Sequence, residues 1–303
     1  MSIEHPHPDL VADPTAGEEA APEIHADAAA VRAEEIALLR RKVDGISVFL
    51  AGPSNVVLQL AWPEVGYGVV ESKVDSGKVT QHPFKRFRTT IGYLSIALLG
   101  SDEQRTAFRK AIDGQHRQVR STPDSPVKYN AFNRDLQLWV ASCIYYGTID
   151  IFTRMHGPLT PHEEAVVLRA GARIGTTLQV HPDDWHQTPA DFWRYWEEGL
   201  ARCHIDDRVG SYLVSLMKVE IMPKPVARLA GPANLWFNNG FLPQSIRDQL
   251  GLSWSDADQR RHDRILRGLG RVTRRAPHVV RAFPMNAMAW NLEVRRRLGR
   301  PMV

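Results

Sequence analysis

Apolar and polar positions between residues 84 and 147 repeat at the spacing of three consecutive helices. In the first, Arg86, Thr90 and Tyr93 stand three or four residues apart, so they lie above one another on one face. That face is polar at its start and apolar at its end, while leucine and isoleucine residues cover the other sides. The pattern predicts a helix that is buried on more than one side.

Arg86 and Thr90 need partners if this helix is buried, because an unpaired buried guanidinium is costly. A carboxylate of a bound ligand is one partner that would suit Arg86. A structural Asp or Glu from another segment is the other. The residues alone leave both interpretations open.

The second helix is expected over residues 102–120. Gly100 ends the first helix, and Ser101 with Gln104 three residues later forms a capping box. His116 lies in the last turns of this helix. A protonated surface histidine is favoured near a helix C-terminus, whereas a neutral histidine facing a cavity is a competent axial ligand for haem iron. Both interpretations stay open at this point.

The third helix opens at Asn133, which is a good N-cap, and continues through the apolar run of residues 136–146. Its residues leave no polar stripe, which predicts burial on most sides. An all-helical fold packs around a helix of this kind. Further helices are expected over residues 30–43 and 160–178, and residues 64–83 are expected to form a long loop over a cavity mouth. The fold class is therefore mainly α, with a single multi-helix domain around a buried cavity.

Composition supports one folded unit with distinct ends. The chain has 303 residues, of which 43% are hydrophobic, which is ample for one large core. Residues 1–30 hold seven acidic side chains and no Lys or Arg, so this tail is expected to be disordered and the helical domain to cover residues 31–303. The two cysteines, Cys143 and Cys203, suit a reducing compartment. Neither a signal peptide nor a run of about 18 apolar residues is present, and a cytoplasmic location is expected.

The C-terminal end is rich in arginine. Residues 260–303 contain twelve arginines against Asp263 and Glu293, a local excess of 12 − 2 = +10. A solvated helix face and weak contact with an anionic membrane surface are the two interpretations of this segment. We expect no nucleic-acid partner, because no recognised nucleic-acid module is present and aromatic residues are sparse among the arginines.

One further cluster could bind a metal ion. His181, Asp183, Asp184 and His186 lie within six residues, but Pro182 and the turn-like composition favour a loop that leads into a helix. The chain has no G-x-S-x-G elbow, H-E-x-x-H, phosphate-binding loop or G-x-G-x-x-G fingerprint. These absences leave the three-helix stretch as the main candidate for chemistry.

Five segments in a fixed order resemble the catalytic domain shared by bacterial rubber oxygenase and the fungal ER-bound oxygenase of mycophenolic acid biosynthesis. They are RFRTT (86–90), HRQV (116–119), YNAFNRDLQLWV (129–140), FWRYWEEGL (192–200) and LPQSIRDQLGLSW (242–254). The similarity covers roughly residues 45–284. Chance does not readily produce five such segments in order.

The resemblance implies a mainly α-helical oxidoreductase that binds haem b and uses dioxygen or peroxide on an apolar small-molecule or lipid-like substrate. It implies that His116 is the proximal iron ligand, and that Arg86 and Thr90 are a polar pair that contacts the cofactor or the bound oxygen. One departure is Ala141, where many members carry a histidine that can supply an outer hydrogen bond. Because of it, a haem-binding helical protein without turnover is one alternative function, and a peripheral membrane or lipid-binding protein is the other.

Overall fold

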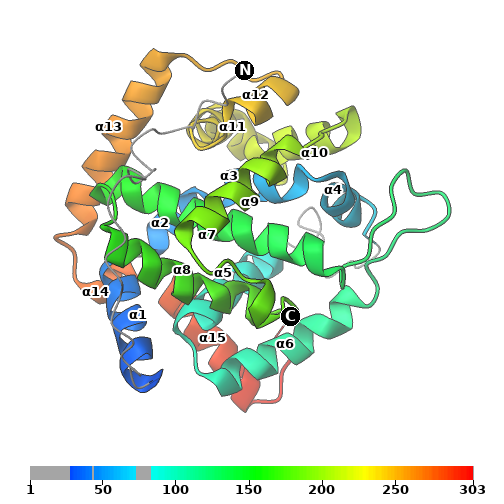
Figure 1. The fold of residues 1–303 in the computed structure, drawn as a ribbon. Coiled ribbons are helices and arrows are strands. Elements are labelled where there is room, and N and C mark those ends of the chain that lie inside the picture. Colours follow the sequence, from blue (N-terminus) through cyan, green and yellow to red (C-terminus); the bar gives the residue numbers. More distant parts are fainter. Residues whose placement is uncertain (1–27, 43, 73–82, 303) are drawn as a thin grey trace.

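The part of the protein that the structure describes is mainly helical. The structure is a computed structural model, and it describes residues 28–42, 44–72 and 83–302. In those ranges there is no β-strand, apart from an isolated bridge between Arg120 and Asn130. The mainly α fold class is confirmed (Figure 1). The helices are α1 (Ala28–Lys42), α2 (Gly45–Leu50), α3 (Gly52–Leu60), α4 (Pro63–Val70), α5 (Pro83–Leu99), α6 (Asp102–His116), α7 (Arg134–His156), α8 (Pro161–Thr176), the 3-10 helix η3 (Pro182–Asp184), α9 (Pro189–Ala201), α10 (Asp207–Met217), α11 (Lys224–Asn239), α12 (Gln244–Gln249), α13 (Asp256–Thr273), α14 (His278–Arg281) and α15 (Met285–Arg297).

The three expected helices of the central stretch are α5, α6 and α7. The Ser101 side chain accepts from the backbone N–H of Gln104, and the Gln104 side chain completes the capping box of α6. Helix α6 ends at His116, four residues before the expected end. The chain then doubles back, and the Ala131 N–H donates to the Val119 carbonyl at 3.0 Å. These backbone groups pair across the loop instead of continuing the helix.

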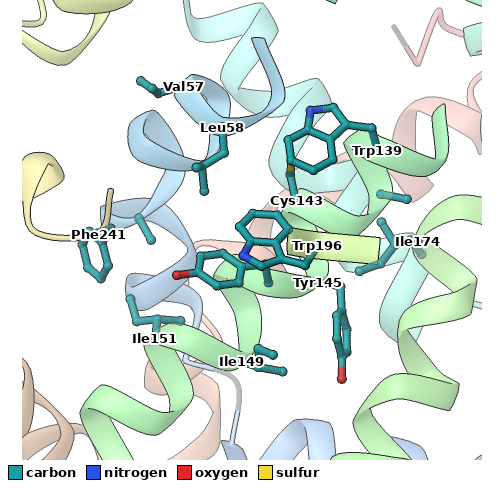
Figure 2. Packing of buried hydrophobic residues seen from close by; sticks show 14 of the residues in the cluster. Val57, Leu58, Trp139, Cys143, Tyr145, Ile149, Ile151, Ile174, Trp196 and Phe241 are labelled. Atoms are coloured by element: carbon teal, nitrogen blue, oxygen red, sulfur yellow. The ribbon is translucent and has the colours of Figure 1, made fainter. Parts of the chain in front are cut away.

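Helix α7 is the centre of the fold, and it packs against α3, α8, α9 and α13. Figure 1 shows it crossing the middle of the molecule. The Asn133 side chain caps its first turn, as expected. Buried residues occur on all of its sides, which confirms the prediction from its missing polar stripe. Figure 2 shows its side chains Trp139 and Cys143 together with Trp196 of α9 in the core.

The core contains a continuous stack of aromatic rings. The Trp139 ring lies 4.7 Å from that of Trp62 and 5.3 Å from that of Trp196, and the Tyr146 ring lies 4.0 Å from that of Trp196, measured between ring centroids. All four side chains are buried. Burial of each large side chain stabilises the fold by about 1.5–3 kcal/mol. The stack fixes α9 and the start of α4 against the central helix.

Helix α5, which carries Arg86 and Thr90, lies against α15. The Ser95 hydroxyl donates to the Met285 carbonyl at 3.0 Å. A Cβ at Gly92 would lie 2.3 Å from a methyl carbon of Leu292, so the absence of a side chain at Gly92 permits this close approach. The C-terminal helix thereby supports the helix of the candidate residues.

Three segments differ from the expectation. The predicted loop begins with a helix, α4, and residues 73–82 of that loop lie outside the described residues. Helix α1 begins two residues early, at Ala28, while residues 1–27 of the expected tail are likewise outside the described part. Residues 229–241 were expected to form a loop or a short helix pair, but residues 229–239 lie within one helix, α11, which continues through Pro232 and packs against α3 and α10. None of the helices described is long and apolar enough to cross a membrane.

Candidate functional site

Arg86 and Thr90 lie one turn apart on α5, as the spacing predicts. Thr90 is half-buried, and the Arg86 residue is exposed. Nearby protein nevertheless desolvates the guanidinium and lowers its pKa, while Tyr212 of α10 opposes the shift.

Arg86 has no acidic partner among the residues that the structure describes. The structural Asp or Glu that was one interpretation of this side chain is therefore not found in the described ranges. A guanidinium has five N–H donors in a planar fork. Such a fork can bind a carboxylate of a ligand through two parallel hydrogen bonds.

His116 is the last residue of α6 and is half-buried. Burial lowers the pKa of its imidazole, and the positive charge of Arg86 lowers it further, while Gln179 and Asp113 act in the opposite direction. Through this electrostatic effect the charge of Arg86 disfavours protonation of His116. The net result is an imidazole that stays neutral at physiological pH.

A hydrogen-bond network fixes which ring nitrogen of His116 carries the proton. His116 Nδ1 lies 3.1 Å from Gln179 Oε1. Gln137 Nε2 donates to the same oxygen at 2.6 Å, and Gln179 Nε2 donates to Asp113. Because both donors fix the orientation of the Gln179 amide, its oxygen faces the imidazole. Nδ1 therefore donates its proton, and Nε2 keeps a free lone pair.

Sequence reasoning did not single out Gln137 or Gln179. Gln137 stands inside the YNAFNRDLQLWV segment, so its place in that segment was a signal that could have identified it. Gln179 follows the end of α8 and belongs to no motif. Ala141, the position of the expected histidine, is buried one turn after Gln137. The side chain that hydrogen-bonds to His116 is Gln179, whose Oε1 accepts from the His116 ring.

The alternative metal cluster near residue 181 does not form. Pro182–Asp184 is a short 3-10 helix, and no group of three or more His, Cys, Asp or Glu side chains in the described ranges is placed to hold a metal ion. His186 turns into the core instead, where its Nε2 lies 2.8 Å from the Ser142 hydroxyl. The loop interpretation of this segment is confirmed.

His186 should make the protein less stable in mild acid. Burial lowers the pKa of His186 from 6.5 to about 4, so the folded state holds this ring neutral. The unfolded chain binds more protons between these two values, and stability falls as the pH falls through that window. From pH 7 to about pH 4.5, His186 should account for a loss of about 2–3 kcal/mol. Urea unfolding at both pH values measures this loss.

A matched pair of variants isolates the contribution of His186. His186→Gln should be less stable at pH 7 but should lose less stability on acidification than the unsubstituted protein. His181→Gln removes an exposed imidazole, so it should keep the full pH dependence. Equal pH dependence of stability in all three proteins would mean that His186 does not cause the loss of stability in acid.

Comparison with known proteins adds a family relationship to this geometry. Residues 39–275 match the family described as ER-bound oxygenase mpaB/B'/Rubber oxygenase, catalytic domain. The chain is also 43% identical over 250 residues to the uncharacterized protein Mb2261 of Mycobacterium bovis and to the uncharacterized protein Rv2237 of Mycobacterium tuberculosis. In both cases the aligned region covers 82% of this chain and 98% of the relative. No solved structure matches the chain.

Proposed function

The chain belongs to the ER-bound oxygenase mpaB/B'/rubber oxygenase catalytic-domain family, and on this basis we propose that it is a haem b-dependent oxygenase acting on an apolar small molecule. In this proposal His116 would hold the haem iron. Arg86 and Thr90 provide polar contacts to the cofactor or to the oxygen that it binds. The activity is that of an oxidoreductase, with dioxygen or peroxide as the second substrate.

The observation that carries the proposal is the state of the His116 ring. A histidine ligand must be neutral and must present an unprotonated nitrogen, and its other nitrogen commonly donates to an oxygen that holds the ring in place. His116 meets these requirements, since its pKa is lowered and Gln179 Oε1 accepts from Nδ1. Nε2 is then the nitrogen available to iron.

Arg86 supports a cofactor with carboxylates. Haem b carries two propionate groups, and a guanidinium can bind a carboxylate through two parallel hydrogen bonds. Arg86 is exposed and has no acidic partner in the described ranges, so its guanidinium is accessible to a ligand. Its positive charge also opposes protonation of His116, so it keeps the ligand nitrogen free.

Aromatic side chains flank both parts of the site. The Phe132 ring stands edge-on to the His116 imidazole, with 6.1 Å between centroids, and Phe49 packs edge-on against Phe87 beside Arg86. These rings place apolar surface beside the site, which favours an apolar substrate. When bound, haem supplies the chemistry that activates dioxygen or peroxide. The chain itself holds the ring of His116 and orients charged groups.

An absorption spectrum with a haem assay tests the proposal. Protein purified from haem-replete cells should show a Soret band and about one haem per chain by the pyridine haemochrome assay. Apoprotein titrated with haemin should saturate at the same ratio. Protein that has no Soret band and does not bind haemin would contradict the proposal.

Gln179→Leu should weaken haem binding without unfolding the protein. The substitution removes the acceptor of the Nδ1 proton, and loss of such an outer partner typically costs 10- to 100-fold in affinity. Haemin titration followed at the Soret maximum measures the effect. Gln249→Leu is a matched control, because that amide bonds the chain near residues 203–205, away from His116. Equal haem affinity in both variants would mean that Gln179 does not hold the ligand.

A further inference from the structure

The C-terminal helices expose an apolar surface. Val279, Val280, Phe283 and Trp290 line one shallow hollow on α14 and α15. Each is between 59% and 71% exposed. Contiguous exposed apolar patches are uncommon on soluble proteins and mark contact surfaces. We call these four residues the apolar patch.

Exposed basic side chains lie next to the apolar patch along the chain. Arg271, Arg274 and Arg275 are exposed at the end of α13, and none lies within ion-pair distance of an acidic side chain in the part of the chain that the structure describes. Arg275 precedes Val279 by only four residues, so their Cα atoms are at most about 14 Å apart. We call these three arginines the basic rim.

The end of helix α1 adds an exposed positive charge near α14. Arg281 of α14 donates to the Arg41 carbonyl at 2.5 Å, so the end of α1 lies beside α14 (Figure 1). Arg40 is exposed next to it. Arg281 itself is held by Asp44 at 2.7 Å, which fixes α14 to the body of the protein. Helix α14, which carries part of the apolar patch, is therefore anchored to the rest of the protein.

We propose that the apolar patch and the basic rim form a docking surface for an anionic lipid bilayer. Tryptophan and phenylalanine prefer the headgroup region, and arginines near an anionic surface each add binding energy. The two exposed valines of the apolar patch have no role in contacts to phosphates or stacked bases, whereas a bilayer accommodates them together with the aromatic rings and the arginines, which favours the bilayer. With no helix in the described ranges able to span a membrane, the contact is with the bilayer surface.

The position of this surface also suits a substrate that dissolves in membranes. Helix α15, which carries Trp290, packs along α5, which carries Arg86 and Thr90. A docked protein would hold α5 close to the bilayer. The docking surface itself does not depend on haem, so its test is independent of the proposed oxygenase activity.

Co-sedimentation with vesicles tests the docking surface in the full-length protein. Vesicles of phosphatidylcholine alone are compared with vesicles that contain about one third phosphatidylserine, at low and high salt. Binding should require the anionic lipid and should weaken with salt. The variant Arg274→Gln/Arg275→Gln should bind about 25-fold more weakly, at about fivefold per arginine. Phe283→Ser/Trp290→Ser should bind at least about tenfold more weakly, because it removes the inserted apolar groups.

Matched controls come from α11, on the other side of the molecule in Figure 1. Lys224→Gln/Arg228→Gln removes two exposed charges, and Leu229→Ser removes an apolar side chain that is 85% exposed. Both should bind vesicles as the unsubstituted protein does. The proposal is overturned if anionic vesicles do not bind at low salt, or if the control variants lose binding equally. It is also overturned if light scattering shows a dimer that Phe283→Ser/Trp290→Ser dissociates, because a second copy would then cover this surface.

Discussion

His116→Ala should abolish stoichiometric haem binding. The substitution removes the nitrogen that we propose as the iron ligand, and with it the ring that Gln179 holds in place. Haemin titration of the variant should give no saturable Soret band at one haem per chain. Metal analysis of the purified variant should show iron at background. Circular dichroism should remain helical, since His116 ends α6 and is only half-buried.

His181→Ala is the matched control for this experiment. Its imidazole is exposed and lies in the loop before α9, where it contacts Asp183. This variant should bind haem as the unsubstituted protein does. If His116→Ala keeps full haem affinity and an unchanged spectrum, the iron has another ligand and the proposed site is wrong.

Arg154→Met should lower the free energy of unfolding by about 3–5 kcal/mol, because it leaves the buried carboxylate of Asp150 without its partner. The Arg154 side chain is 4% exposed, and it bonds Asp150 within α7 at 2.8 Å and Asp263 of α13 at 3.0 Å. Methionine keeps an unbranched apolar side chain, so most of the loss in the free energy of unfolding comes from removal of the positive charge. Urea unfolding at pH 7 measures the change.

An exposed ion pair supplies the comparison for Arg154. Arg194 bonds Asp191 at 2.6 Å on α9, and its side chain is 68% exposed. Arg194→Met should change the free energy of unfolding by less than about 1 kcal/mol, because water screens such pairs. A loss below about 1 kcal/mol for Arg154→Met as well would mean that water or rearrangement satisfies Asp150 after the substitution.

The sequence by itself determined the helical architecture around the candidate site. Helix α7 was predicted as central because its apolar residues cover every side, and Asn133 marked its start. Ser101 with Gln104 marked the start of α6. These features are local, since capping and periodicity involve residues within one or two turns. For the same reason the Arg86 and Thr90 spacing on α5 was readable from the chain alone.

The sequence did not determine the boundaries that depend on distant contacts. The end of α6 is set by the pairing of the chain at Val119 with Ala131, twelve residues later. The continuity of α11 through Pro232 depends on packing against α3 and α10, which offsets the hydrogen bond that proline lacks.

Only the tertiary structure decided the chemical state of His116. Its proton position depends on Gln179, which is 63 residues away, and on Gln137 of α7. Its pKa depends on burial and on the charge of Arg86, which belongs to another helix. The amino-acid sequence shows which side chains are present and how they are spaced. Desolvation and hydrogen-bond direction arise only when packed helices place those side chains around one ring.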